Sequence, residues 1–202
     1  MATKHSAYRK KIINNLYFSK MLSCAEVSEK IGKSLSLTTK ILAELIEGGY
    51  VVETGYAPSS GGRRPQMYAL KPDIMYTVAV AMDQFVTKLA VVNMHNQYVG
   101  QVETLELNLA KDGDTLHKLI AKIEQVIIQS GVEKSRIAGI GISMPGFINA
   151  RDGINYSFLE KTDGGITACV SAKTGLPVYL DNDSGVIALA EQKFGIAGQR
   201  EN

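Results

Sequence analysis

The sequence has no apolar run approaching the roughly 20 residues that a membrane-spanning helix needs. Residues 1–11 are polar and basic and no apolar signal region follows them, so nothing here marks the chain for export. Cysteine is also scarce: Cys24 and Cys169 lie far apart and in different predicted parts of the chain. We therefore expect a cytoplasmic protein with no membrane contact, whose cysteines are reduced thiols packed in the interior rather than a disulfide or a metal knuckle.

The charge of the chain is unevenly distributed, although the net charge is only +2. Residues 1–71 contain 11 Lys and Arg against 5 Glu, a net charge of +6. Residues 72–202 contain 11 Lys and Arg against 15 Asp and Glu, a net charge of −4. This distribution is typical of a small module that binds a polyanion, joined to a larger, mildly acidic part that binds something else.

The basic part carries the pattern of three helices. Residues 6–18 have apolar side chains at the spacing of a helix with one buried face. Ser23, with Glu26 three positions later, predicts a capping box that opens a short helix ending at Gly32. Ser34 is then expected to cap a third helix that closes at residues 48–49. Two short helices joined by a tight turn with glycine indicate a helix-turn-helix.

Two β-forming stretches, residues 50–54 and 66–70, flank a glycine loop and predict a two-stranded hairpin. The loop carries Arg63 and Arg64 at its tip, and Pro65 begins the second strand. Taken alone, this could be a solvated loop with two incidental arginines. Following a helix-turn-helix, it predicts the wing of a winged helix-turn-helix domain over residues 1–72.

A recognition helix enters the major groove with the residues near its N-terminus facing the base edges. Once the buried face of the third helix is assigned to Thr38, Ile41, Leu42, Leu45 and Ile46, Ser36, Leu37, Thr39 and Lys40 near its start are left for DNA. Leu37 is expected to reach a thymine methyl, and Lys40 a phosphate or a guanine. The predicted DNA-binding residues are Ser34, Ser36, Leu37, Thr39, Lys40, Arg63 and Arg64.

Residues 73–202 change to an α/β pattern. Strands are expected at residues 77–82, 88–93, 97–107, 137–143 and 176–180, and helices at residues 114–130, 162–174 and 183–192. The first three strands predict an antiparallel start to a mixed sheet. The order strand, strand, strand, helix, strand, helix, strand, helix is that of one lobe of a ribonuclease-H-like fold of the sugar kinase and actin type. The fold class is therefore α+β and α/β, in two domains.

Several motifs in this order resemble those of the ROK family of repressors, open reading frames and sugar kinases. They are the helix-turn-helix and residues 62–65, 70–73, 139–146 and 175–183. The chain is similar to the family's transcriptional regulators of the xylose and N-acetylglucosamine repressor type over nearly its whole length. The resemblance implies a winged helix-turn-helix ahead of a two-lobed body that binds a sugar or a sugar phosphate.

Kinases of this family open with an Asp-x-Gly-x-Thr turn, which matches residues 83–87 here. Phe85 replaces the glycine, and a bulky side chain there should prevent the backbone from cradling a phosphate. Asp183 stands at the position of the family's catalytic base. We therefore expect a sugar site without kinase activity, in which Asp183 is not catalytic.

The resemblance places the sugar-binding residues at Gly146, Asn155, Asn182 and Asp183. The surroundings of Asn155 depart from the family pattern, and Asp183 could instead serve only to cap a helix. The family's zinc segment and second lobe would lie beyond residue 202, so no cofactor or metal is expected within this chain. We accordingly expect residues 73–202 to be the first lobe of a longer protein.

The leading hypothesis is a sugar-responsive transcriptional regulator, a repressor of carbohydrate-use genes. It would act as a homodimer or higher homo-oligomer on a double-stranded DNA operator and bind a sugar or sugar-phosphate effector. One alternative is an ATP-dependent sugar kinase with an accessory winged-helix module. Another is an adaptor whose winged helix binds protein, against which the basic surplus argues.

Overall fold

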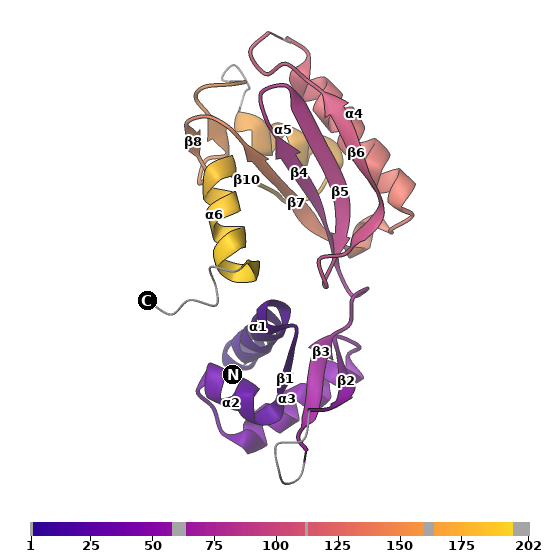
Figure 1. Ribbon diagram of the computed structural model, residues 1–202, viewed down its shortest axis with the longest axis vertical. Helices are drawn as coiled ribbons and strands as arrows, with labels where there is room; N and C mark the ends of the chain where they lie inside the picture. The colour runs from indigo at the N-terminus through magenta and orange to yellow at the C-terminus, as the bar shows by residue number, and fades with distance from the viewer. Residues whose placement is uncertain (1, 58–63, 112, 160–163, 196–202) are drawn as a thin grey trace. The chain divides into compact units, whose positions relative to one another are not determined.

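The computed structural model describes residues 2–57, 64–111, 113–159 and 164–195 (Figure 1). The chain divides into two compact units, Met1–Ile74 and Met75–Asn202, called here the head and the body. This division lies two residues after the boundary expected at residue 72. Among the described residues, no helix combines the length and apolar character needed to cross a membrane.

Three helices build the head: α1 (Ala2–Ser19), α2 (Cys24–Ile31) and α3 (Leu35–Glu47). The predicted capping box is present, since the Glu26 N–H donates to Ser23 Oγ and the Ser23 N–H donates to the Glu26 carboxylate at 2.7 Å. Gly32 ends α2 in the left-handed region, with φ of +64°, which glycine adopts without strain. Ser34 caps α3, as predicted. Apolar side chains from all three helices form the head's core.

The small sheet of the head has three strands: the two predicted as a hairpin, and a third that was not predicted. Strands β2 (Val51–Tyr56) and β3 (Gln66–Leu70) form the expected antiparallel pair, and β1 (Met21–Ser23) pairs with the other edge of β3. A three-residue segment directly before a helix shows no alternation of its own. Its assignment depends on hydrogen bonds to a strand more than forty positions away, which no local pattern reports.

A mixed five-stranded sheet forms the body, in the order β10-β7-β4-β5-β6. Strands β4 (Tyr76–Met82), β5 (Val86–Asn93) and β6 (Tyr98–Glu106) form an antiparallel meander, and β7 (Ile137–Met144) and β10 (Val178–Asn182) add parallel to β4. The antiparallel start and mixed sheet were both predicted. A hairpin of β8 (Ile148–Asn149) and β9 (Ile154–Asn155) was not predicted.

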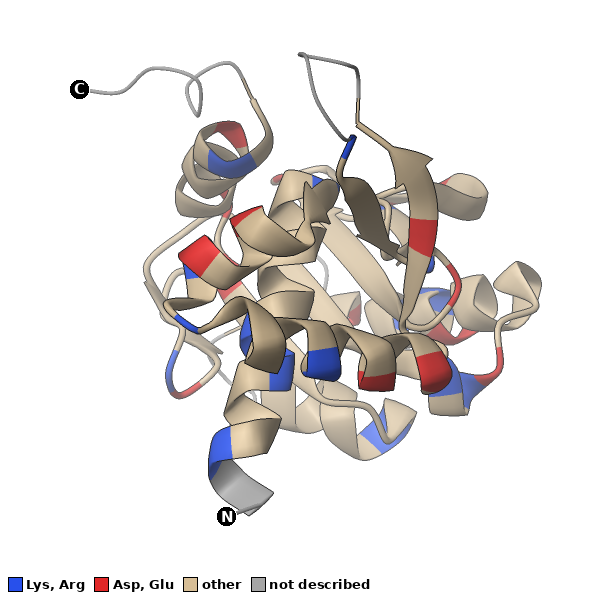
Figure 2. Cartoon of the chain, turned by 90° about the horizontal axis from the view of Figure 1, so that it is seen from below, with Lys and Arg blue, Asp and Glu red and all other residues tan. Residues whose placement is uncertain are grey.

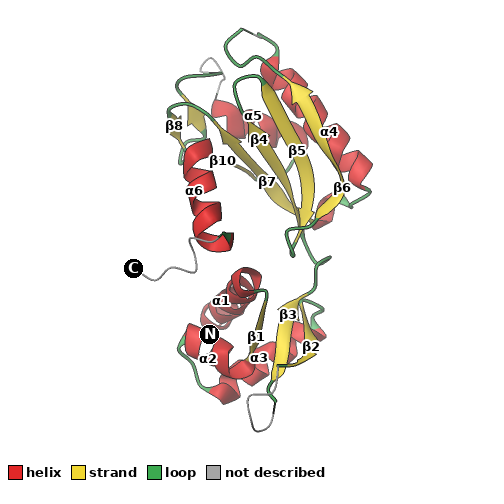
Figure 3. Cartoon of the chain, viewed as in Figure 1, coloured by secondary structure: helices red, strands yellow, loops and turns green. Residues whose placement is uncertain are grey.

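Helices α4 (Thr115–Ser130) and α5 (Gly165–Thr174) pack on one face of this sheet (Figures 1 and 3). Helix α6 (Asp183–Phe194) follows β10 in the chain and lies on the other side of the sheet. A short 3₁₀ turn, η1 (Lys134–Arg136), precedes β7. Strand β4 shows how one face is covered: Val78 and Val80 are buried, whereas Ala79 and Ala81 between them are exposed.

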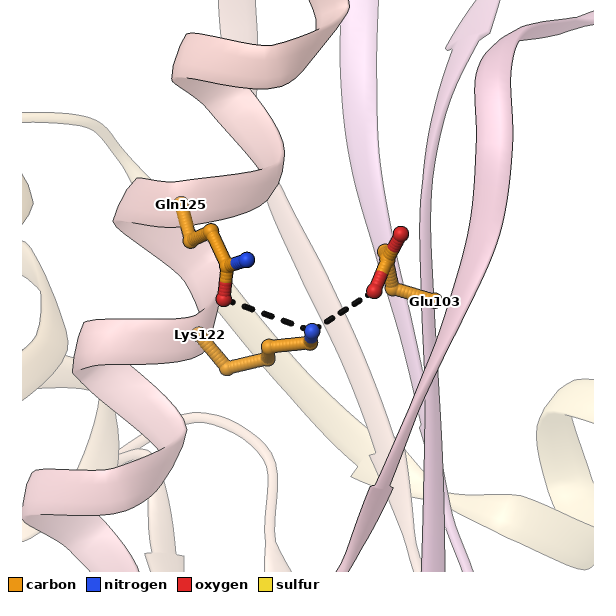
Figure 4. A network of polar contacts seen from close by, with 3 residues as sticks. All are labelled: Glu103, Lys122 and Gln125. Atoms are coloured by element: carbon orange, nitrogen blue, oxygen red, sulfur yellow. Dashed lines mark hydrogen bonds and ion pairs between the residues drawn. The ribbon is translucent and has the colours of Figure 1, made fainter.

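One ion pair ties α4 to the sheet (Figure 4). Lys122 Nζ donates to Glu103 Oε2 of β6 at 2.6 Å and to Gln125 Oε1 at 3.3 Å. The Lys122 side chain is only 14% exposed and that of Glu103 27%, so the pair is partly shielded from solvent. Such a bond fixes the position of α4 over β6 beyond what apolar packing alone specifies.

The two cysteines are free thiols, as expected, but the prediction that they are packed in the interior was wrong. Cys24 and Cys169 are both only half-buried. Cys24 is the first residue of α2, and its Sγ lies 3.3 Å from the Thr39 hydroxyl of α3. The small number of cysteines did not predict how exposed each one is. The exposure of Cys24 depends on how α2 packs against α3.

Candidate functional site

Helix α3 has one buried and one exposed side. Thr38, Ile41, Leu42 and Leu45 are at most 1% exposed and face the head's core. The exposed residues in its first two turns are Leu35, Ser36, Thr39 and Lys40. A helix held by one buried face, with Ser36, Thr39 and Lys40 exposed on the other, has the arrangement that a recognition helix requires.

Bonds at both ends of α3 fix it within the head. At its start, Ser34 Oγ accepts from the Leu37 N–H, and the buried Thr38 hydroxyl donates to the Ser34 carbonyl at 3.0 Å. Farther along, Glu44 Oε2 lies 2.6 Å from His5 Nε2 of α1. The hydrogen bond from His5 lowers the pKa of the Glu44 carboxyl below its usual value. The exposed residues therefore lie on a helix that is held by its own N-terminal cap and by a bond to α1.

The predicted DNA-binding residues occupy different environments. Ser36, Thr39 and Lys40 are exposed, as expected from their places opposite the buried positions. Ser34 is exposed but its hydroxyl caps the helix, and Leu37 is half-buried. Leu35 was not among the predicted DNA-binding residues, but it is 56% exposed. Leu35 directly follows the capping Ser34, so its place in the first turn of α3 could have been predicted from the sequence.

At the wing, Arg64 is exposed and lies two residues before the start of β3 at Gln66, whereas Arg63 lies outside the described residues. The charged positions of the chain are coloured in Figure 2. Helix α3 itself carries one basic residue, Lys40, and two acidic ones, Glu44 and Glu47, in its second half. The positive charge of α3 therefore lies in its N-terminal half.

In the body, three of the four predicted sugar-binding residues converge on the turn after β7. Gly146 has φ of +112°, and a Cβ there would lie 2.8 Å from Asn155 Oδ1. The Gly146 carbonyl accepts from Asn182 Nδ2 at 3.1 Å. Asn182 also caps α6, since its Oδ1 accepts from the Gly185 N–H at 3.2 Å. Only glycine combines this backbone angle with so close an approach of Asn155.

Asn155 and Asp183 differ in accessibility. Asn155 is 1% exposed, donates to the Pro145 carbonyl at 2.8 Å and accepts from the N–H groups of Ser157 and Phe158. Asp183 is half-buried at the first position of α6, and its Oδ1 accepts from the Ser184 N–H at 2.7 Å. The helix cap is Asn182 rather than Asp183, so the capping role considered for Asp183 belongs to its neighbour.

The turn between β4 and β5 is closed by its own carboxylate. Asp83 Oδ1 accepts from the N–H groups of Phe85 and Val86, both at 2.7 Å. These two hydrogen bonds lower the pKa of the Asp83 carboxyl below its usual value. The Phe85 side chain is 62% exposed. The backbone donors of this turn are thus engaged by Asp83 in this structure.

A hollow of about 860 Å³ lies against the open face of the sheet. Its lining is largely apolar and includes Ala79, Ala81 and Val102, together with the polar residues Ser143 and Asp181. None of the four predicted sugar-binding residues lines it. Within the described ranges, no group of three or more His, Cys, Asp or Glu is arranged to hold a metal ion.

The chain is similar to several transcriptional regulators. It is 28% identical to the xylose repressor of Caldicellulosiruptor bescii over 194 residues, which are 93% of this chain and 48% of that protein. It is 26% identical to the xylose repressor of Bacillus subtilis over 200 residues, 96% of this chain and 50% of that protein. The chain spans about half the length of these curated relatives.

Among solved structures, the chain is similar to a ROK family transcriptional regulator described as a homologue of the Mlc protein of Escherichia coli. The TM-score is 0.65 at 21% identity, over 92% of this chain and 49% of that one, which shows a shared fold. The sequence model described as "ROK family" matches residues 78–202. Because this match covers more than half of the chain, and the head and lobe recur in the regulator's fold, the protein belongs to the ROK family.

Proposed function

We propose that this chain contains the DNA-binding head and part of the sugar-sensing body of a transcriptional regulator, a repressor of carbohydrate-use genes. The observation that carries the proposal is α3, whose buried face packs in the head while Ser36, Thr39 and Lys40 are exposed at its start. The relatives that match nearly the whole chain are named as repressors. Each head would place α3 in the major groove of one operator half-site.

In this proposal, Lys40 and the wing arginines contact the duplex backbone, and Ser36 and Thr39 contact base edges or phosphates. Lys40 and Arg64 are exposed, with no salt bridge between them and an acidic group among the described residues. A lysine or arginine that neutralises a phosphate releases a counterion, so binding weakens with salt. We propose that the protein binds as a homodimer or higher homo-oligomer, so that two heads contact the two half-sites of an operator.

The proposed sugar site is the turn after β7 together with the start of α6. Asn182 and Asp183 offer an amide and a carboxylate, the groups that bind sugar hydroxyls, and the Gly146 turn brings backbone close to them. We propose that Asn155, enclosed by backbone partners, acts mainly by holding this turn. Since the chain spans about half of its relatives' length, a complete effector site is proposed only for a two-lobed protein.

We propose that this site binds sugar without transferring phosphate. The carboxylate of Asp83 engages the N–H groups of Phe85 and Val86, which would otherwise be the donors that cradle a phosphate. The exposed Phe85 side chain adds bulk where the kinase turn has glycine. A coupled assay with ATP and a panel of sugars on the two-lobed protein tests this, and turnover with any sugar would contradict it.

The DNA-binding proposal is tested by selecting duplexes from a random library with the wild-type chain and measuring affinity against salt. Lys40→Ala and Arg64→Ala should each weaken binding to all selected duplexes roughly tenfold, and each should lower the slope of log K against log salt by about 1. Lys111→Ala, an exposed lysine of the body, is the charge-matched control and should have no effect on the slope. If no duplex is enriched at low salt, the proposal is wrong.

A thermal-shift screen tests the sugar proposal separately. A sugar that binds the folded protein raises its unfolding temperature by mass action. Asp183→Asn should abolish the shift produced by the best sugar while leaving DNA affinity without sugar unchanged. The absence of any shift across sugars and sugar phosphates on the two-lobed protein would count against effector binding.

A further inference from the structure

Leu35 is an apolar side chain at the start of a polar helix face. It is the first residue of α3 and is 56% exposed, whereas the leucines that hold α3 in the core, Leu42 and Leu45, are at most 1% exposed. A leucine is not needed for the cap, because Ser34 provides that hydrogen bond. Leu35 is therefore not one of the buried residues of α3 and does not form its cap.

The helix geometry places Leu35 beside the proposed base-reading residues. Leu35 lies one turn before Thr39, on the same side of α3, and Ser36 lies one turn before Lys40 on the adjacent strip. Thr39 in turn lies 3.3 Å from Cys24 at the start of α2. Leu35 thus lies next to the side of α3 that faces the start of α2. It is at the N-terminal end of α3, the end expected to enter the major groove.

The chemistry of the major groove identifies a partner for this side chain. Base pairs present hydrogen-bond donors and acceptors there, together with a single apolar group, the 5-methyl of thymine. An exposed leucine cannot satisfy a donor or an acceptor, but it gains by covering a methyl group and removing both from water. Leu37, the residue expected to make such a contact, is half-buried and less available.

We propose that Leu35 is a specificity-determining residue that contacts the 5-methyl group of a thymine in each operator half-site. This inference rests on the DNA-binding function proposed above and adds to it the base that one residue reads. In this structure Leu35 is already exposed, on a helix held by the Ser34 cap and the bond between Glu44 and His5.

The test is a chemical double-mutant cycle on the full 202-residue chain. The probe is a duplex enriched from a random library by the wild-type chain, in which each thymine is replaced singly by uracil to remove the methyl and keep base pairing. One replacement should weaken wild-type binding about three- to fivefold, the loss expected for one buried methyl. Leu35→Ala should bind the parent duplex about as weakly and be insensitive to that same replacement.

Matched variants separate the contact from a general effect. Ser36→Ala, at an adjacent exposed position of the proposed interface, is expected to lower overall affinity but to show the same fold-loss on uracil replacement as the wild type. Leu35→Asn, a polar side chain of similar size, should shift the selected base at one position away from thymine. Thermal unfolding of each variant establishes that α3 is still folded, as expected for a substitution at an exposed first position.

Two results would overturn the inference without affecting the proposed function. In one, duplexes are selected and bound, but no uracil replacement weakens wild-type binding. In the other, Leu35→Ala remains as sensitive to every replacement as the wild type. If the wild-type chain enriches no duplex at all, the DNA-binding function itself is wrong, and the thymine contact is wrong with it.

Discussion

Helices α3 and α6 begin in the same way and are held differently. Both start after a side-chain cap, Ser34 for α3 and Asn182 for α6. Helix α3 then buries four residues in the head, whereas α6 has no buried residue in the described chain. Helix α6 also exposes large apolar side chains, among them Ile187, Leu189 and Phe194. A cap specifies where a helix starts, but packing decides how firmly it is held.

The difference also separates what each helix offers to a ligand. Helix α3 is fixed along its length, so its exposed residues have defined positions relative to the head. Helix α6 offers its start, where Asn182 bonds to the Gly146 carbonyl and Asp183 follows. We therefore expect DNA to contact the first turns of α3, and a sugar to contact α6 only at its N-terminus.

The largest expected effect comes from truncating matched leucines in the two helices. Leu45→Ala removes a side chain that is fully buried in the head and should destabilise α3 by about 3 kcal/mol. Leu189→Ala, at 54% exposure in α6, should change stability by less than about 0.5 kcal/mol. Hydrogen exchange of peptides from each helix measures both. Equal losses in the two variants would show that α6 is packed as firmly as α3.

The next largest effect comes from the caps. Ser34→Ala and Asn182→Ala should each cost about 1 kcal/mol in local stability, because each leaves a backbone N–H of the first turn without its partner. Asn182→Ala should in addition release the turn at Gly146, whose carbonyl loses the Asn182 donor. Faster exchange at residues 146–149 in Asn182→Ala, and not in Ser34→Ala, is the expected signature. Unchanged exchange at residues 146–149 would show that the bond from Asn182 does not stabilise the Gly146 turn.

A smaller change in stability is expected for α4, within the body. Lys122→Met removes the partly shielded bond to Glu103 and should destabilise the contact of α4 with β6 by about 0.5 to 1 kcal/mol. The exposed Lys173→Met of α5 is the matched control and should be nearly neutral. Urea unfolding followed by exchange in α4 provides the measurement. If both variants behave alike, apolar packing alone positions α4.

The smallest effect concerns pH and the bond between Glu44 of α3 and His5. The pKa of Glu44 is lowered in the folded protein, chiefly by the hydrogen bond from His5. The carboxylate therefore stabilises the head above its unfolded pKa, and this contribution is lost as pH falls through the folded pKa. Protection of α3, corrected for intrinsic exchange, should decrease slightly below about pH 4.5 in the wild type. Glu44→Gln should lack that decrease, and an identical decrease would assign it elsewhere.

Local signals in the sequence predicted the starts of α2 and α3 and most strands of the body, whereas α1 begins four residues before the predicted residue 6. Ser23 with Glu26, Ser34 and Gly32 act on backbone groups within a few positions, so their consequences can be derived without knowing the fold. The exposure of Leu35 and the partial burial of Leu37 could not be derived this way. They depend on which side of α3 meets α1 and the rest of the head's core.

By itself, the sequence determined two units of opposite charge, the helix caps and the order of strands, because these follow from composition, periodicity and contacts between near neighbours. Only the tertiary structure decided that β1 completes the head's sheet and that Gly146 meets Asn182. The latter pair lies 36 positions apart, and it is brought together because β7 and β10 pair in parallel with Met144 beside Asn182. Such long-range register is set by the packing of the whole sheet.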